Sequence, residues 1–277
     1  MHTPPCGPAP GGSAPARLDI AVLNCPGSGT EKYHVAFERW INSVTDQVKV
    51  SWTVFEADQR QLPPTNANFY GYIISGSKHG VYEDIPWIQE LCTWVCQAHS
   101  RRCKLLGICF GHQVVAKALG GEVQPNPAGF VIGRYPTSIS MQAREYFQSL
   151  GSWEDLQESG QTASQLTMNF VHGDYVVQVP SSLRCMGGTP LSPHNGLFNG
   201  SNILTFQGHP EFSAENVSAC LGSLLARGVL PPRLPVGTHL AQVKESLEGR
   251  VDSKWIGSTV LRFFQDIDHE EPVPGET

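Results

Sequence analysis

The sequence contains no long apolar run and no block of basic residues. Its apolar runs are short, as in residues 203–206, far below the roughly 20 residues that cross a bilayer. The formal net charge is -6 at pH 7, and no cluster of Lys or Arg forms the electrostatic footprint typical of nucleic-acid-binding proteins. We therefore expect neither a membrane span nor a nucleic-acid partner.

A secretory signal is missing as well, because residues 1–17 have no apolar core segment. The 8 cysteines are spread through the chain, which without a secretory signal favours a reducing compartment, and we expect a cytoplasmic protein. Cys92 and Cys96 lie one helical turn apart, but no second ligand pair with zinc-like spacing accompanies them. We expect no metal site and no cofactor.

The two ends of the chain have a composition that does not support a core. Residues 1–17 are rich in Pro, Gly and Ala, and residues 270–277 read EEPVPGET, so neither segment buries enough apolar surface to offset the entropy of ordering it. We expect both to be disordered tails. The 40% hydrophobic content is sufficient for one large core, and without an internal repeat we expect a single domain over residues 18–269.

From residue 18 to residue 119, apolar strands alternate with helical patterns. We expect strands over 18–23, 48–55, 70–74 and 104–108, and helices over 31–44, 86–98 and 111–119. Later in the chain we expect antiparallel strands over 130–135, 166–171, 175–179 and 203–207, then helices over 214–227 and 255–266. Alternation of this kind is typical of βαβ units, so the predicted fold class is α/β, with a mostly parallel central sheet and an added antiparallel section.

The strongest motif is Gly-x-Cys-x-Gly at residues 107–111, at the end of an apolar strand. This is the Cys form of a nucleophile elbow, in which flanking glycines allow a sharp turn from strand to helix and leave the central residue projecting. Cys109 would face the N-terminus of the following helix, and the N–H of Phe110 would stabilise an oxyanion there. The alternative for Cys109 is a buried structural thiol, which is what we expect of the other cysteines.

His209 is the candidate base for this thiol. It lies in the segment Gln-Gly-His-Pro-Glu, directly after the apolar run 203–206. Pro210 favours an extended backbone, in which residues i and i+2 project to the same side, so the Glu211 carboxylate can reach the imidazole. The carboxyl ends of parallel strands meet at one edge of a sheet, so a long separation from Cys109 along the chain is no obstacle. The competing base, His172, lies between two apolar runs, and we expect it in a loop.

Together these segments resemble the class I glutamine amidotransferases, over about residues 18–212. Residues 107–113 read Gly-Ile-Cys-Phe-Gly-His-Gln and residues 207–211 read Gln-Gly-His-Pro-Glu, in the order and at the separation of that family's motifs. The resemblance implies a flavodoxin-like three-layer sandwich. It also implies a catalytic triad of Cys109 as nucleophile, His209 as base and Glu211 as the partner of the base.

The resemblance implies an oxyanion hole and substrate contacts as well. Phe110 would supply one oxyanion N–H, and the loop after the third strand a second, at Gly76 and Ser77, although many members have Gly-Gly-Pro where this chain has Gly-Ser-Lys. Substrate contacts fall on Gln113 and on backbone N–H groups of the segment around Val171 and His172. Candidates for the wall that faces the leaving amine are Lys78, His79, Tyr82 and Arg134.

Closest in character are free-standing γ-glutamyl peptidases of plants, which share an Ile-Ser-Gly-Ser loop and a Gln-Gly-His-Pro-Glu-Phe segment, here residues 74–77 and 207–212. This resemblance implies a hydrolase that cleaves a γ-glutamyl amide bond of a small molecule, such as a γ-glutamyl peptide or a glutathione conjugate, through a thioester on Cys109. One alternative is a glutaminase subunit that delivers ammonia to a separate synthase. The other is a non-catalytic interaction protein with the same fold.

Overall fold

The computed structural model describes residues 17–25, 32–64, 66–152, 164–230 and 240–266. Apart from Arg17, both predicted tails, 1–17 and 270–277, lie outside the described residues. Their disorder and the single domain over 18–269 stay predictions.

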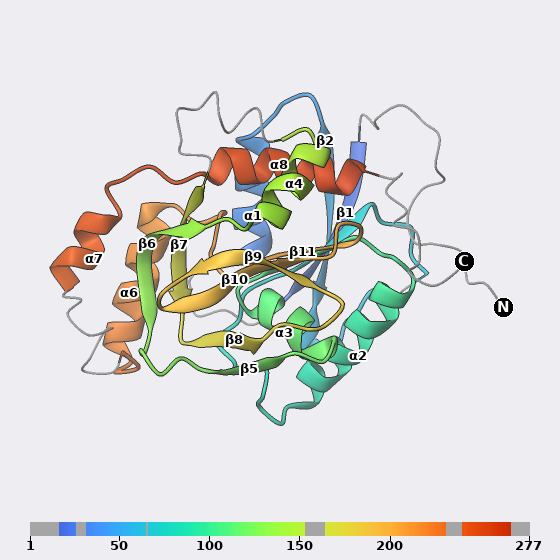
Figure 1. Cartoon of the computed structure of the whole chain (residues 1–277). Coiled ribbons are helices and arrows are strands. Elements are labelled where there is room, and N and C mark those ends of the chain that lie inside the picture. The colour runs from blue at the N-terminus through green and yellow to red at the C-terminus, as the bar shows by residue number, and fades with distance from the viewer. Residues whose placement is uncertain (1–16, 26–31, 65, 153–163, 231–239, 267–277) are drawn as a thin grey trace.

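A seven-stranded sheet forms the centre of the molecule, in the order β2-β1-β3-β4-β11-β10-β9 (Figure 1). Neighbours from β2 to β11 pair in parallel, whereas β10 is antiparallel to both β11 and β9. The strands of this sheet are β1 (Arg17–Asn24), β2 (Lys49–Glu56), β3 (Gly71–Ile74), β4 (Leu105–Ile108), β9 (Arg184–Thr189), β10 (Ser192–Phe198) and β11 (Ile203–Phe206).

Two antiparallel ribbons complete the β structure. One pairs β5 (Glu122–Pro125) with β8 (Asp174–Gln178), and the other pairs β6 (Val131–Ser138) with β7 (Gln165–His172). The second ribbon is tied to the main sheet just beyond β11, because the His209 N–H donates to the Asn169 carbonyl oxygen at 2.7 Å.

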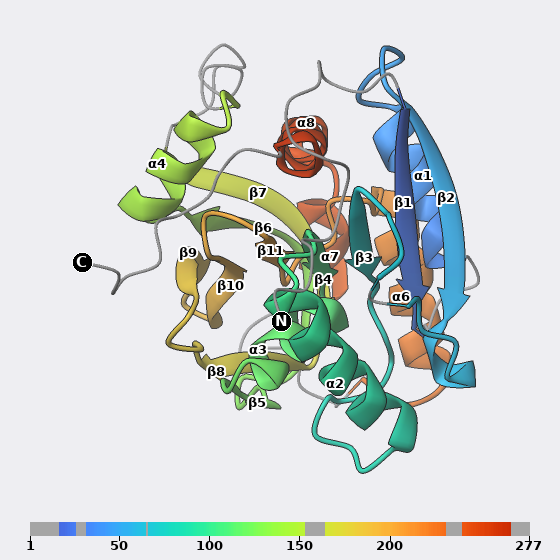
Figure 2. The ribbon, with the colours of Figure 1, turned by 90° about the vertical axis from the view of Figure 1, so that its right-hand side faces the viewer.

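Helices cover both faces of the sheet (Figure 2). On β1, Ile20 and Val22 pack with the helices of one face, and Ala21 and Leu23 with those of the other, as the alternation of side chains along a strand requires. The first face carries α1 (Tyr33–Asn42), α4 (Met141–Ser149) and α8 (Ser253–Gln265), and the second carries α2 (Pro86–Ser100), α3 (Phe110–Ala118) and the 3-10 helix Ala57–Gln59. A smaller cluster joins α6 (Ala214–Ala226) and α7 (Leu240–Ser246) to the β6–β7 ribbon.

The predicted α/β sandwich with a mostly parallel sheet and an added antiparallel section is confirmed. One strand orientation was wrong, because β11 runs parallel to β4 and not antiparallel. Ile203, Leu204, Thr205 and Phe206 are all fully buried, which is typical of a central parallel strand with both faces covered. The sequence patterns also missed β5, β9, β10, α4 and α7.

No helix among the described residues is long and apolar enough to cross a membrane.

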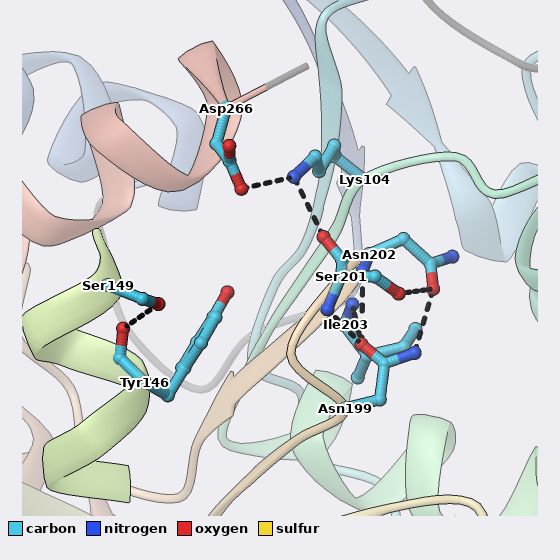
Figure 3. Close-up of polar contacts among 8 residues, drawn as sticks. All are labelled: Lys104, Tyr146, Ser149, Asn199, Ser201, Asn202, Ile203 and Asp266. Carbon is cyan, nitrogen blue, oxygen red and sulfur yellow. Dashed lines mark hydrogen bonds and ion pairs between the residues drawn. The ribbon is translucent and has the colours of Figure 1, made fainter. Parts of the chain in front are cut away.

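The Lys104 ammonium joins the start of β4 to the end of α8 (Figure 3). Its Nζ atom lies 2.7 Å from the Ser201 carbonyl oxygen and 3.5 Å from the Asp266 carboxylate, and 4.8 Å from the centre of the Phe263 ring. Burial lowers the pKa of Lys104, and Asp266 opposes that shift. The carboxylate is therefore part of what keeps this cation charged.

We expect Asp266→Asn to lower the free energy of unfolding by about 1–2 kcal/mol, because a largely buried ammonium then lacks its counter-ion. The double variant Lys104→Met, Asp266→Asn should regain most of the loss, since no unpaired charge remains. Urea unfolding measures both, with Asp46→Asn, an exposed carboxylate, as the control. Equal stability of Asp266→Asn and Asp46→Asn would contradict the role of this pair.

Candidate active site

Cys109 lies in a strained turn between β4 and α3. Its backbone has φ 54° and ψ -102°, a region that residues with a side chain rarely adopt. The turn depends on the two flanking glycines. A Cβ atom on Gly111 would lie 2.2 Å from the Ile74 carbonyl oxygen, and one on Gly107 would lie 2.7 Å from the Gly111 carbonyl carbon. Only residues without a side chain fit this close approach.

The pairing of β4 with β11 brings the two sequence motifs to the same edge of the sheet. Ile108 and Phe206 are paired, and the Cys109 N–H donates to the Phe206 carbonyl oxygen at 2.8 Å. The chain then continues to His209, whose side chain interacts electrostatically with that of Cys109 and lines the same cleft.

The imidazole of His209 is held by a carboxylate within the protein. Its Nδ1 atom lies 2.7 Å from Oε1 of Glu211, and the two residues are 2% and 4% exposed. Burial acts to lower the pKa of His209, but the Glu211 carboxylate and Cys109 outweigh it and hold that pKa well above its usual value. His209 therefore carries a proton readily and is oriented by a fixed partner.

Parallel aromatic rings fix the plane of this imidazole. The His209 ring stacks on Phe212 at a centroid distance of 4.1 Å, and Tyr33 of α1 stacks on His209 at 6.2 Å and on Phe212 at 6.0 Å. Burial raises the pKa of the Tyr33 hydroxyl well above its usual value, so it stays protonated. Sequence reasoning missed Tyr33, because nothing in the pattern of α1 marks it as a neighbour of His209.

A cleft of about 390 Å³ opens above Cys109. Cys109 lines this cleft, and its sulfur lies 3.7 Å from the Val171 carbonyl oxygen. The predicted site residues that line it are Ser77, Cys109, Gln113, Val171, His172 and His209. Gly76, Phe110 and Glu211 are not among the lining residues.

The Gly76 backbone passes close to Tyr33 and His209. A Cβ atom there would lie 2.6 Å from the Tyr33 hydroxyl and 3.1 Å from Cε1 of His209. The N–H of Phe110 begins α3, where a helix has no internal acceptor for it. Both proposed oxyanion donors therefore come from segments that border Cys109.

Two expectations for this region were wrong. His172 is the last residue of β7 and is 3% exposed, not part of an open loop. Burial lowers its pKa to about 4, so it is neutral at neutral pH. Lys78, His79 and Tyr82 line the cleft, but Arg134 does not, because its guanidinium donates to the carbonyl oxygens of Ser246 and Arg250.

Helix α6 supplies a wall of the cleft that sequence reasoning did not identify. Cys220, Leu224 and Arg227 line it, together with two acidic residues, Glu83 from the segment between β3 and α2 and Asp174 at the start of β8. The helix itself was predicted, but which of its faces borders the cleft depends on how it packs against the β6–β7 ribbon. The described residues contain no cluster of His, Cys, Asp and Glu suited to a metal ion.

Comparison with known proteins places this geometry in a family. The profile of the glutamine amidotransferase class-I family matches residues 32–219. The chain belongs to this family. The resemblance stated from the two motifs is thereby confirmed, and the class-I fold supports a hydrolase.

The relatives of this chain match it over different shares of their own length. A glutamine amidotransferase-like protein of Schizosaccharomyces pombe is 28% identical over 86% of this chain and 86% of its own length. Gamma-glutamyl peptidase 3 of Arabidopsis thaliana is 27% identical over 72% of this chain and 78% of its own length. A glutamine-hydrolysing GMP synthase of Porphyromonas gingivalis is 28% identical over 71% of this chain, but over only 36% of its own length.

Solved structures share the class-I fold. A glutamine amidotransferase from Methylobacillus flagellatus superposes with a TM-score of 0.65 over 95% of this chain and 99% of its own, at 17% identity. One from Thermotoga maritima gives a TM-score of 0.63 over 89% of this chain and 98% of its own, also at 17% identity.

The glycine contacts at the elbow lead to a stability prediction. Gly111→Ala places a methyl group against backbone atoms of Ile74, and we expect it to lower the free energy of unfolding by about 1–3 kcal/mol. Gly222→Ala on α6 is the matched control, because a Cβ atom there meets nothing within 4 Å. It should be neutral or up to about 1 kcal/mol stabilising. Denaturant unfolding measures both variants. Equal free energies of unfolding for Gly111→Ala and Gly222→Ala would contradict the packing argument.

The Glu211 contact leads to a prediction on ionisation. In Glu211→Gln the pKa of His209 should fall, because burial remains while the carboxylate is lost. Since the folded pKa is raised, protonation of His209 stabilises the fold at low pH, and that contribution disappears as pH rises through the folded pKa. NMR titration of ¹³C-labelled histidines measures the shift, with Glu215→Gln, an exposed carboxylate, as the control. An unchanged pKa of His209 in Glu211→Gln would contradict the role of the Glu211 carboxylate in raising that pKa.

Proposed function

We propose that this protein is a cysteine hydrolase that cleaves a γ-glutamyl amide bond through a γ-glutamyl thioester on Cys109. One observation carries the proposal. The Cys109 thiol at the N-terminus of α3 and the His209 imidazole line the same cleft and interact electrostatically, and the imidazole is hydrogen-bonded to Glu211 at 2.7 Å. The names of the Arabidopsis thaliana gamma-glutamyl peptidases among its relatives support the choice of substrate class.

The first half of the reaction forms the thioester. His209 accepts the thiol proton as the sulfur of Cys109 attacks the γ-carbonyl carbon. The resulting oxyanion accepts hydrogen bonds from the N–H groups of Phe110 and of the loop at Gly76 and Ser77. Collapse of this intermediate breaks the carbon–nitrogen bond, and His209 returns the proton to the leaving amine.

The second half regenerates the thiol. Water gives a proton to His209 and attacks the thioester carbonyl, the carbon–sulfur bond breaks, and glutamate leaves as the thiolate recovers its proton. Glu211 holds the imidazole in one tautomer and stabilises its cation in both halves. The low pKa of His172, about 4, makes its imidazole too weak a base to replace His209 as the acceptor of the thiol proton.

The γ-glutamyl group is held by Gln113 and the β7 end of the cleft. The Gln113 amide nitrogen donates to the Asp174 carbonyl oxygen at 3.1 Å and to Oε1 of Gln207 at 3.0 Å, which fixes its orientation. Backbone groups around Val171 and His172 border the same space and bind the α-carboxylate.

A second candidate function is that of a glutaminase subunit which delivers ammonia to a separate synthase. The similarity to a GMP synthase over 36% of that protein's length favours it. This function predicts that glutamine turnover rises many-fold when a synthase co-purifies with the protein. Full activity of the isolated chain on γ-glutamyl peptides would argue for the hydrolase.

The test is turnover of purified protein on glutamine and a panel of γ-glutamyl peptides, followed by intact-mass analysis for an acyl-enzyme. Cys109→Ala should lower turnover at least about 10³-fold, because the nucleophile is lost. Cys220→Ala is the matched control, since this second thiol lines the same cleft, and it should keep most of the activity. Inertness of the wild-type protein toward the whole panel, with no adduct on Cys109, would overturn the proposal.

A further inference from the structure

Residues 209–212 form a short turn whose backbone is also held by elements outside it. The turn is closed by the Phe212 N–H, which donates to the His209 carbonyl oxygen at 3.2 Å. Further hydrogen bonds join it to other elements, through the His209 N–H and the carbonyl oxygens of Pro210 and Phe212. The turn carries both the imidazole and the Glu211 carboxylate, so these bonds influence how the two side chains lie relative to each other.

Asn169 of β7 holds both ends of this turn. Its carbonyl oxygen accepts the His209 N–H at 2.7 Å, and its side-chain amide nitrogen donates to the Phe212 carbonyl oxygen at 2.9 Å. Asn169 is 3% exposed, so removal of the amide would leave a buried carbonyl group without its donor. Because the Phe212 ring stacks on the His209 ring at 4.1 Å, the bond to Phe212 also holds the residue that covers the imidazole.

Ser253, the first residue of α8, holds the middle of the turn. Its hydroxyl donates to the Pro210 carbonyl oxygen. Ser253 is itself held, because its carbonyl oxygen accepts the indole N–H of Trp40 in α1 at 2.8 Å. The preceding Asp252 ties the start of α8 to β7, since its N–H donates to the Thr167 carbonyl oxygen at 2.9 Å and its carboxylate accepts the Thr167 N–H at 2.7 Å. The hydroxyl is therefore presented by a fixed helix end.

Asn169 and Ser253 are uncharged, and neither lines the cleft above Cys109. Among the described residues, the titratable groups that act on His209 or stack on its ring are Tyr33, Cys109, His172, Glu211 and Cys220. Exchange of Asn169 or Ser253 for another uncharged residue therefore leaves the charges around the imidazole and the lining of the cleft in place. What such an exchange changes is the backbone support of the turn.

We propose that Asn169 and Ser253 are positioning residues, which hold the turn 209–212 so that the His209 imidazole stays on its carboxylate partner. This inference rests on the proposed function and deepens it, because the position of the imidazole affects turnover only if His209 carries the proton. A misplacement of about 1 Å in an active site costs on the order of 10²-fold in rate. Loss of one of these bonds should therefore lower kcat, while substrate still binds to an unchanged cleft.

The first measurement separates kcat from KM on the γ-glutamyl compound that the wild-type protein turns over fastest. Asn169→Leu, a side chain of similar shape that cannot donate, should lower kcat on the order of 10- to 100-fold with KM close to that of the wild type. Ser253→Ala should lower kcat in the same way but less, because only one of the bonds to the turn is lost and the side chain is half-buried. Ser253→Thr retains a hydroxyl and should recover most of the rate.

Asn202→Leu is the matched control for Asn169→Leu. Asn202 is also 3% exposed, its side-chain amide nitrogen donates to the Cys103 carbonyl oxygen at 3.1 Å, and its own carbonyl oxygen accepts the Leu105 N–H at 2.8 Å. It precedes β11, whereas His209 follows the other end of that strand. Asn202→Leu should therefore lose stability in urea as Asn169→Leu does, because each loses a buried hydrogen bond, but it should keep the kcat of the wild type.

A second measurement needs no substrate. NMR titration of ¹³C-labelled histidines follows the pKa of His209, which Glu211 and Cys109 hold well above its usual value. This pKa should fall in Asn169→Leu and in Ser253→Ala, because an imidazole displaced from its carboxylate loses part of what stabilises the cation while burial remains. It should stay unchanged in the control Asn202→Leu. A fall in this pKa supports the inference even if the wild-type protein hydrolyses no γ-glutamyl compound.

Three outcomes would overturn the inference. The first is an unchanged pKa of His209 in both Asn169→Leu and Ser253→Ala. The second is a loss of kcat in Asn169→Leu no larger than that in Asn202→Leu. The third is a rise in KM at constant kcat, because such a change would place the two residues in ligand binding and not in positioning. If Asn169→Leu does not fold, Ser253→Ala decides on both measurements.

Discussion

The candidate site depends on the parallel pairing of β4 with β11. The two motifs lie far apart in the chain and meet because Ile108 and Phe206 are partners in this pairing. The bond from the Cys109 N–H to the Phe206 carbonyl oxygen continues the ladder into the elbow itself. A shift of the register by one residue would turn every side chain of the strand to the opposite face, so the buried strands also fix which side chains face the site.

The elbow and the neighbouring loop form one packed unit. The Gly111 N–H donates to the Ser75 carbonyl oxygen at 3.1 Å, and the Gly111 backbone lies against the Ile74 carbonyl group. The strain at Cys109 is therefore held by contacts between α3 and the end of β3. The same contacts set the distance from the sulfur to the loop that carries Gly76, so nucleophile and loop cannot move independently.

The part of this arrangement that the sequence predicts is the part set by residues close together in the chain. Glycines around Cys109, and the spacing of His209 and Glu211, specify geometry within a few residues, and the alternating strands and helices specify a parallel sheet. Strands β9 and β10 escape prediction because they contain glycine and proline, which are depleted in strands, and gain their stability from pairing with neighbours. Tyr33 and the lining residues of α6 escape because their positions follow from tertiary packing alone.

The residues specified by local motifs differ from those placed by tertiary packing in the part of the site that they form. The groups that we propose for the chemistry lie at strand ends of the sheet, where two short motifs determine their placement. The cleft walls come from Tyr82 in a loop after β3, from Asp174 where β7 gives way to β8, and from α6, whose apolar face packs on Ile132 of the ribbon. These walls meet only through long-range contacts such as the Tyr82–Asp174 hydrogen bond. Substitutions in the walls can therefore change which acyl group or leaving amine fits while the sulfur, imidazole and carboxylate stay in register.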